Sequence, residues 1–475
     1  ETNGCFYIES PAMRGLLKKL KCDDYLTLVA ASSIIRPGVS SSGMMREYIY
    51  RFNNPEKFTY LHPILEQQLK ETFGVMVYQE DVLKVCHHFA GLDLGDADVL
   101  RRAMSGKYRS KEEFQRIINK FFQNCKNRNY PEETTREVWR QIESFAAYSF
   151  SKAHSASYAV ESYQSLYLKA YFPKEFMVAV LNNFGGFYSA WVYINEARRW
   201  GAIIHTPCVN HSNPLTRIIG KNIYLGFGYV NGVEQNLGNK IAAERKENGE
   251  FTNLENFISR VNIGIQQLIL LIRANAFSFT GKTKATLLWE AHMLLGKKDS
   301  IELQNRLFNL PHKNFTLPNL DQNRLEDAYD ELELFGFPVT CSYFDLLKTS
   351  FRGEYKARDL LLHVGEKIRM VGQLVVIKYV RTIKRELMHF GCFLDDTGEF
   401  FDTVHFPQSL KSNPFKGYGV YLILGKVVEE FGFAAIEVEK MAKLPVKSLD
   451  DKNALPEPKI QPGYNPFDYH SSPSP

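Results

Sequence analysis

Apolar residues recur every three or four positions over most of the first 200 residues, for example in 82–90 and again in 114–122. This spacing predicts amphipathic helices. Proline and glycine separate the runs, as at Pro37-Gly38, and mark turns between helices. The pattern therefore predicts a mainly α-helical domain, which we place at residues 1–215.

Shorter helical runs follow at residues 216–297, with small-residue turns at 231–233 and 262–264. These turns predict two helix-turn-helix units in tandem. Asn, Gln and Pro then become frequent and the periodicity fades, so residues 298–364 are interpreted as a linker with short helices.

Five short runs rich in β-branched and aromatic residues occupy residues 365–445. Turn sequences such as 395–398 separate them, which is typical of strands joined by tight connections. Five strands in about 80 residues favour a small all-β barrel of the OB type. Residues 446–475 are rich in Pro and Ser, and we expect a disordered tail there.

Length and composition narrow the class of protein. A chain of 475 residues is long enough for several domains, and its 44% hydrophobic and 23% charged residues are typical of soluble globular proteins. No apolar run reaches the length of a membrane span, so no membrane partner is expected. The segment Glu1-Thr2-Asn3-Gly4 is neither an initiator Met nor a secretory signal, which suggests a fragment of a larger protein.

The seven cysteines are scattered, odd in number and lack a CxxC pair. This pattern argues against a disulfide framework and a structural zinc site, and it favours reduced thiols in the cytoplasm. The net charge of +5 permits a polyanionic partner without requiring one.

Positive charge concentrates in residues 101–111, which contain Arg101, Arg102 and Lys107. Arginine pairs offer forked donors that match phosphate oxygens, and lysine adds a point charge. A second segment holds Lys152 and His154, with Ser155 as a neutral donor. The alternative interpretations are a solvated helix face for the first segment and a structural histidine in the second.

The two segments together resemble the fingers domain of the C-family bacterial replicative DNA polymerases, the polymerase III alpha subunits. That family carries an LRRAM helix, here residues 100–104, and an F-x-K-x-H-S turn, here 150–155. Other landmarks occur in the same order, including GVMVYQE at 74–80 and SYQ at 162–164. The resemblance covers residues 1 to about 280 closely and 330–443 more loosely.

The resemblance implies an enzyme that adds deoxynucleotides to a primer 3′ end on a DNA template. It implies that the chain is the part from the fingers domain onward, with Arg101, Arg102, Lys107, Lys152, His154 and Ser155 binding the incoming triphosphate. In the family, Mg²⁺ ions are held by palm aspartates that precede the segment matching Glu1. No metal ligand is therefore assigned here, and the fragment alone is expected to be inactive. Asp96 and Asp98 are interpreted as helix-start and charge-pairing residues.

Residues 226–240 resemble a helix-hairpin-helix, whose turn presents backbone N–H groups to DNA phosphates. The family usually has Gly-Val-Gly in this turn, whereas this chain has Gly232-Val233-Glu234. Phosphate binding and a purely structural role both stay open for the turn. The resemblance names Arg36, Gly232, Gly238 and Lys240 as DNA-contacting residues. The second hairpin has little basic charge and is interpreted as a packing unit.

The predicted barrel carries Lys378, Arg381, Lys384 and Arg385 close to Tyr379 and Phe390. Basic residues interleaved with aromatic ones are what OB-folds use to bind single strands. These cations are therefore predicted to contact the template. The alternative for the aromatic residues is a place in the barrel core.

Residues 304–308 resemble the Gln-x-x-Leu-Phe peptide that binds the sliding clamp. Leu307 and Phe308 would fill an apolar pocket while Gln304 hydrogen-bonds at its rim. The alternative is a helix in which Ile301 and Leu303 share an apolar face with them.

The expected partners are primer-template DNA, deoxynucleotide triphosphates, the beta sliding clamp and other polymerase III holoenzyme subunits. Contact with the tau clamp-loader subunit stays open. Two other functions also stay open: an error-prone alpha-subunit paralogue and a non-catalytic DNA-binding protein.

Overall fold

The computed structural model describes residues 2–35, 43–104, 111–145, 151–183, 186–295, 323–382 and 384–449. Its contacts divide the chain into two compact units. Unit 1 holds Glu1–Leu168, Leu361–Val364 and Val427–Ala435, and unit 2 holds Lys169–Leu360, Gly365–Lys426 and Ile436–Pro475.

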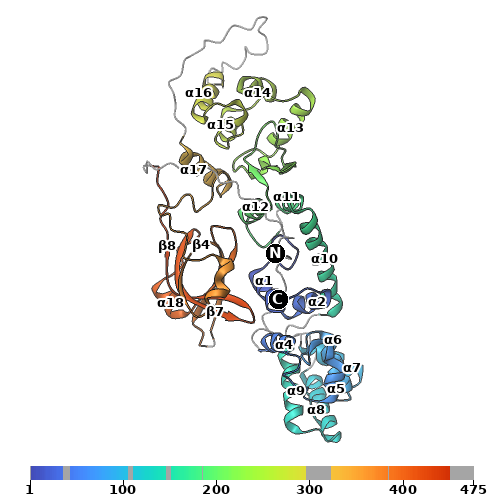
Figure 1. The fold of residues 1–475 in the computed structure, drawn as a ribbon. Coiled ribbons are helices and arrows are strands. Elements are labelled where there is room, and N and C mark those ends of the chain that lie inside the picture. Colours follow the sequence, from blue (N-terminus) through green and yellow to red (C-terminus); the bar gives the residue numbers. More distant parts are fainter. Residues whose placement is uncertain are drawn as a thin grey trace, which may run out of the picture. The chain divides into compact units, whose positions relative to one another are not determined.

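Apart from Val427–Ala435, which belongs to two strands described below, unit 1 is mainly helical, as the spacing of apolar residues predicts (Figure 1). Its helices are α1 (Pro11–Lys19), α2 (Tyr25–Ile34), α4 (Met44–Asn53), α5 (Pro63–Leu69), η1 (Lys70–Thr72), α6 (Gln79–His88), α7 (Leu94–Met104), α8 (Lys111–Asn127), α9 (Glu132–Phe145) and the first part of α10 (Lys152–Tyr171). Side-chain caps fix some helix starts: Ser10 accepts from the Met13 N–H and Asp24 from the Thr27 N–H. The aromatic rings of Tyr48, Phe89 and Phe121 are among the largest fully buried side chains.

Unit 2 begins with the end of α10, followed by α11 (Pro173–Asn183) and α12 (Ala190–Arg199). A small three-stranded sheet comes next, formed by β1 (Ile203–His205), β2 (Arg217–Ile219) and β3 (Asn222–Tyr224) in the order β1-β3-β2. β3 pairs parallel to β1 and antiparallel to β2. The sequence pattern did not predict this sheet, because strands of three residues are too short to show an alternation.

Two helix pairs follow the sheet, in agreement with the predicted tandem units. The elements are η2 (Phe227–Tyr229), α13 (Leu237–Asn248), α14 (Leu254–Val261), α15 (Ile265–Arg273), η3 (Ser278–Thr280) and α16 (Lys284–Leu295). Phe251, Phe257 and Phe277 lie fully buried in their shared core, together with Leu268 and Leu271. The turn between α14 and α15 places Asn262 in the left-handed region, which asparagine tolerates better than most residues.

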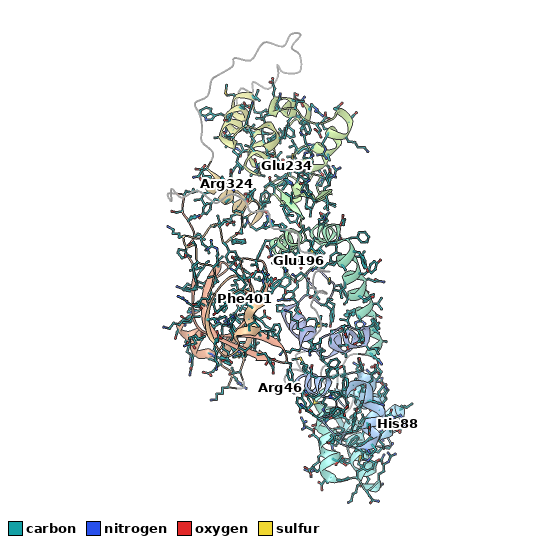
Figure 2. The ribbon with its side chains drawn as sticks, in the orientation of Figure 1. Arg46, His88, Glu196, Glu234, Arg324 and Phe401 are labelled. Carbon is teal, nitrogen blue, oxygen red and sulfur yellow. The ribbon has the colours of Figure 1, made fainter. Side chains whose placement is uncertain are left out.

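α17 (Arg324–Phe335) and η4 (Ala357–His363) precede a closed five-stranded barrel, as predicted. The strands are β4 (Lys367–Arg381), β5 (Leu387–Leu394), β6 (Phe400–His405), β7 (Val420–Glu430) and β8 (Phe433–Lys443), with α18 (Pro407–Ser412) after β6. Their order around the barrel is β4-β5-β6-β8-β7. Phe401 is buried inside the barrel (Figure 2). Its ring leaves room only for glycine at position 372, because a Cβ there would lie 2.5 Å from the ring.

Two absences apply to the described part of the chain. No helix in it combines the length and apolar character that a membrane crossing requires. Nor does it contain a group of three or more His, Cys, Asp and Glu side chains that could hold a metal ion.

Candidate functional site

The first turn of α6 joins the two basic segments that the sequence singles out. The Glu80 carboxylate accepts hydrogen bonds from the Ser151 hydroxyl at 2.9 Å and from the Lys152 backbone N–H at 3.0 Å. The neighbouring Gln79 Oε1 accepts from Arg101 Nη1 at 2.9 Å. Arg101 and Lys152 are far apart in the sequence, yet both are fastened to adjacent residues of one helix.

Asp81 fixes the start of α6, and with it the positions of Gln79 and Glu80. Its buried carboxylate accepts from the backbone N–H groups of Val77 and Tyr78 at 3.0 and 2.9 Å. Such a cap satisfies donors that a helix start otherwise leaves unpaired. Burial raises the pKa of Asp81 to about 6 even though these hydrogen bonds favour the charged form.

The two arginines of the first segment share one carboxylate. Arg101 donates to Asp98 Oδ1 from Nε at 2.9 Å and from Nη2 at 2.7 Å, while Arg102 Nη2 lies 2.6 Å from Asp98 Oδ2. The hydrogen bond from Arg101 is the main reason that the pKa of Asp98 is lowered. More than half of the Arg102 side chain is exposed, so Arg102 is the more accessible of the two cations.

Asp96 also forms ion pairs, with Arg116 at 2.8 Å and with Lys120 at 2.5 Å. Both carboxylates of this helix are therefore used in charge pairing. Charge pairing is the role that the sequence predicts for Asp96 and Asp98.

The Lys152 ammonium lies 2.6 and 2.7 Å from the two carboxylate oxygens of Glu71, and 5.5 Å from the centroid of the Tyr78 ring. Both members of this ion pair are partly exposed. Exposed pairs contribute little net stability, so an anionic ligand could replace Glu71 at small cost.

His154 and Ser155 have different surroundings, although they are adjacent. The His154 side chain is exposed and its ring centroid lies 4.4 Å from that of Tyr158. Ser155 is fully buried, with its hydroxyl 2.5 Å from that of Ser33 in α2. This burial favours a packing role for Ser155 over the phosphate contact expected from the sequence.

The first hairpin turn is tied to the second hairpin by a side chain that the sequence did not single out. Gln267 of α15 accepts a hydrogen bond from the Glu234 N–H at 2.8 Å and donates to the Gly232 carbonyl at 2.9 Å. Gly232 has a positive φ of 85°, which explains a glycine there. Figure 2 labels Glu234 at this turn.

Gly238 and Lys240 lie in the first turn of α13 and differ in exposure. A Cβ on Gly238 would meet the Phe227 side chain at 3.2 Å, so this glycine allows close packing of α13. The Lys240 side chain is exposed, and within the described residues it forms no ion pair.

The barrel presents its four predicted cations on β4 and the turn after it. Lys378 is directly opposite Phe390 in the β4–β5 register, and Arg381 is opposite Leu387. Lys384 and Arg385 are exposed in the connection to β5. Among the described residues, none of the four cations has a carboxylate partner, whereas exposed Phe390 and Tyr379 lie beside them.

Five predicted site residues cannot be compared with the structure. Arg36, Lys107, Gln304, Leu307 and Phe308 lie outside the described residues. Their roles stay predictions.

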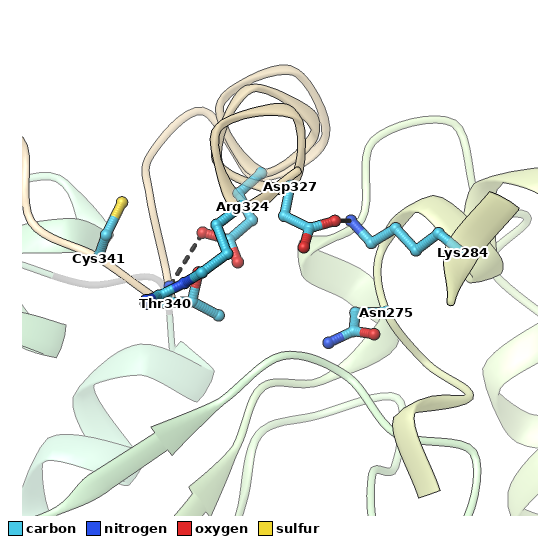
Figure 3. Close-up of a pocket in the computed structure, with 7 residues that line it drawn as sticks. Asn275, Lys284, Arg324, Asp327, Thr340 and Cys341 are labelled. Carbon is cyan, nitrogen blue, oxygen red and sulfur yellow. Dashed lines mark hydrogen bonds and ion pairs between the residues drawn. The ribbon is translucent and has the colours of Figure 1, made fainter. Parts of the chain in front are cut away.

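A polar pocket of about 370 Å³ lies beside α17, and Figure 3 shows its lining. Its charged groups already have partners. Lys284 of α16 lies 2.9 Å from Asp327 of α17, which links the two helices. Glu331 of α17 accepts from the Thr340 N–H at 2.9 Å, which links α17 to the segment after it. We therefore interpret the pocket as part of a packing contact.

The sequence missed Glu71, Gln79, Glu80 and Gln267 as contributors to these sites. Gln79 and Glu80 belong to the GVMVYQE landmark, which was noted only for its order along the chain. Glu71 and Gln267 carry no comparable signal, because their roles arise from contacts with distant residues.

Comparisons with known proteins were consistent with this architecture. The model of the bacterial DNA polymerase III alpha subunit finger domain matches residues 1–129, and a helix-hairpin-helix motif model matches residues 201–287. The chain is 33% identical over 436 residues to the DNA polymerase III subunit alpha of Aquifex aeolicus (strain VF5), covering 90% of this chain and 36% of that protein.

Two staphylococcal proteins of the same name give similar values. The Staphylococcus epidermidis RP62A protein is 31% identical over 434 residues, covering 90% of this chain and 40% of that protein. The Staphylococcus aureus MSSA476 protein is 33% identical over 420 residues, covering 86% and 38%. The chain thus spans between a third and two fifths of the length of these curated relatives. With both family models matched in order, the chain is similar over most of its length to bacterial DNA polymerase III alpha subunits.

Proposed function

We propose that this chain holds the incoming nucleotide and the DNA in a polymerase that adds deoxynucleotides to a primer 3′ end on a DNA template. The observation that carries the proposal is the meeting of Arg101 and Lys152 at Gln79 and Glu80. Catalysis of phosphoryl transfer depends on positioning and charge neutralisation, and these bonds attach the two cationic segments to adjacent residues of one helix.

The triphosphate would be bound by Arg101, Arg102, Lys107, Lys152 and His154. The Asp98 carboxylate pairs with Arg101 and Arg102, and the Glu71 carboxylate pairs with Lys152. A triphosphate would compete with these carboxylates for the same donors, because charge-assisted bonds to phosphate have similar geometry. Ser155 would support the turn by packing against α2.

The metal ions of the reaction would be held outside this chain. Mg²⁺ supplies charge neutralisation of the phosphates when it is bound in the family's palm domain. The described residues include no group of side chains that fits such an ion, so no step is assigned to a metal here.

DNA would be held at three places. Lys378, Arg381, Lys384 and Arg385 would contact single-stranded template, Gly232, Gly238 and Lys240 would lie at a hairpin that holds duplex, and Arg36 would also contact DNA. Gln304, Leu307 and Phe308 would bind the beta sliding clamp. The polymerase would act in the cytoplasm, together with the other holoenzyme subunits.

The proposal is tested with the purified 475-residue chain and a fluorescent primed template. We expect binding that weakens with salt, and no primer extension when deoxynucleotides and Mg²⁺ are added. Failure to bind DNA at low salt would reject the DNA-holding role. Extension by a preparation free of other polymerases would reject the assignment of the catalytic ligands to a part outside this chain.

A further inference from the structure

An open groove of about 640 Å³ lies between β2 and the second half of α13. Arg217 of β2 lines one side, and Ala242, Ala243, Arg245 and Lys246 of α13 line the other. The α13 part of the lining runs from Ala242 to Lys246, five to nine residues beyond Leu237, the first residue of the helix. At 1.5 Å per residue this is about 7.5 to 13.5 Å along the helix axis, so the groove lies beyond the hairpin turn along α13.

The groove lining contains three cations and no carboxylate. Burial is the main cause that lowers the pKa of Arg245, and the nearby charge of Arg217 lowers it further, while Cys208 and Glu250 act in the opposite direction. With three cations and no carboxylate on its lining, the groove favours an anionic ligand.

Arg245 is held rigidly and still has donors to offer. Its Nη1 donates to the carbonyls of Val209 and Ser212 at 2.7 and 2.8 Å, and its Nη2 donates to Asn213 Oδ1 at 2.7 Å. A guanidinium has five N–H donors. The Nε–H and one Nη2–H therefore make no hydrogen bond to the described residues.

Arg217 and Lys246 are exposed, and neither forms an ion pair within the described ranges. Most other cations of this region are paired, for example Arg260 with Glu244 at 3.0 Å and Lys282 with Glu290 at 2.5 Å. The unpaired charge is thus concentrated at the groove.

Two features of the groove suit a nucleic-acid backbone. Ala242 and Ala243 have small side chains, which leave room for a ligand to approach the helix. Ile219 follows Arg217 on the same face of β2 and is 40% exposed, and Leu215, which precedes the strand, is 52% exposed. Alternating cationic and apolar contacts match the alternation of phosphate and sugar along a strand.

We propose that the groove between β2 and α13 binds the sugar-phosphate backbone of DNA, through Arg217, Arg245 and Lys246. The inference rests on the proposed DNA-holding function and adds a contact surface away from the hairpin turns. A backbone contact of this kind is independent of base sequence.

The test measures DNA affinity of the purified chain against salt concentration. The double variant Arg217→Ala/Lys246→Ala should bind duplex DNA roughly tenfold or more weakly at low salt, since two charged contacts are lost. The plot of log K against log salt should become shallower by about 1.8 in slope, because each phosphate contact accounts for about 0.9. A matched control removes two exposed, ion-paired cations elsewhere, Arg136→Ala/Lys282→Ala, and should leave affinity and slope unchanged.

A second variant, Ala243→Glu, keeps all three cations and places a carboxylate in the groove. It should weaken binding without lowering the melting temperature. If both groove variants still bind DNA with the salt dependence of the parent, the groove does not bind the DNA backbone. The proposed DNA-holding function would not be affected by that result. No DNA binding by the parent would instead reject the proposed function. Competition by free deoxynucleotide, lost in the double variant, would show a mononucleotide site and overturn the backbone assignment.

Discussion

Gln267 Oε1 accepts a hydrogen bond from the backbone N–H of Glu234 at 2.8 Å, so the second hairpin's helix holds the turn of the first. The same amide donates to the Gly232 carbonyl, so both its donor and its acceptor are used. A phosphate at this turn would need to bind other N–H groups or displace Gln267. The two hairpins therefore act as one structural unit.

The Gln267 bridge should stabilise the hairpin region. Replacing Gln267 with Ala should lower the free energy of unfolding by about 1–2 kcal/mol, because two hydrogen bonds to backbone groups are lost. The exposed neighbour Gln266 is the matched control, and Gln266→Ala should change stability by less than about 0.5 kcal/mol. Denaturant unfolding measures both variants. Equal stability of the two would show that the bridge contributes nothing.

Release of Lys152 from Glu71 should strengthen nucleotide binding in the full-length enzyme. Glu71→Gln removes the carboxylate that competes with phosphate for the Lys152 ammonium, so KM for nucleotide should fall. Lys152→Ala should raise KM or lower kcat, by roughly 10- to 150-fold in kcat/KM if a charge-assisted contact is lost. In the double variant the benefit of Glu71→Gln should disappear. A Glu71→Gln effect that persists without Lys152 would contradict this pairing.

Replacing either Arg101 or Arg102 with Ala should lower kcat/KM for nucleotide in the full-length enzyme. Arg101→Ala also breaks the link to Gln79, so it should affect folding stability more than Arg102→Ala. Arg136 on α9 pairs with Glu132 on an exposed face and is the control for charge loss. Steady-state kinetics that match Arg136→Ala would identify both arginines as a solvated helix face.

The buried ion pair between Lys169 and Glu196 should be sensitive to loss of one partner. The two side chains are 2% and 1% exposed, and their charged atoms lie 2.8 Å apart. Lys169→Met removes the nearer cation of the Glu196 carboxylate and leaves Arg199 at 3.4 Å; loss of one partner costs about 3–5 kcal/mol in buried pairs. The double variant Lys169→Met/Glu196→Gln should be less destabilised than the sum of the single variants. Additive losses in equilibrium unfolding would exclude a direct interaction.

Much of the fold could be predicted because long elements leave a long pattern. The barrel strands β4 and β7 have 15 and 11 residues, and their turns carry clear signals. The sheet β1-β3-β2 was missed because its strands have three residues each. A pattern that short cannot be distinguished from a loop.

The candidate site was predictable at the level of residue types and less so at the level of partners. Arg101 and Lys152 were singled out by charge and motif, yet Asp98 and Glu71 as their partners depend on tertiary contacts. Ser155 shows the limit of a motif: its neighbours in the sequence are polar, but the fold buries it against Ser33. Nothing in the sequence singles out Gln267, because a polar residue on an amphipathic helix usually faces solvent.

His405 gives the barrel a pH dependence with a defined sign. The side chain is fully buried, its Nε2 lies 2.8 Å from the Thr403 hydroxyl, and no described group bonds its Nδ1. Burial, with a smaller effect of His389, lowers the pKa of His405 to about 3. The unfolded pKa is about 6.5. The unfolded chain therefore takes up the proton first, and stability is lost as pH falls from about 6.5 towards 3.

The comparison of parent and His405→Gln isolates this effect from other titrating groups. Asp81 acts in the opposite direction, since its raised pKa makes the folded state bind a proton more tightly than the unfolded chain as pH falls below about 6. The Asp81 contribution is present in both proteins and cancels in their difference. At about pH 7.5 the parent should be the more stable, because the variant's glutamine side chain would lack the packing of the imidazole against Phe415. That advantage should shrink by up to about 2 kcal/mol at about pH 5, since the parent alone carries the cost of keeping the imidazole neutral. Denaturant unfolding at a series of pH values measures the difference, and a gap that stays constant over this pH range would show that His405 titrates normally in the folded barrel.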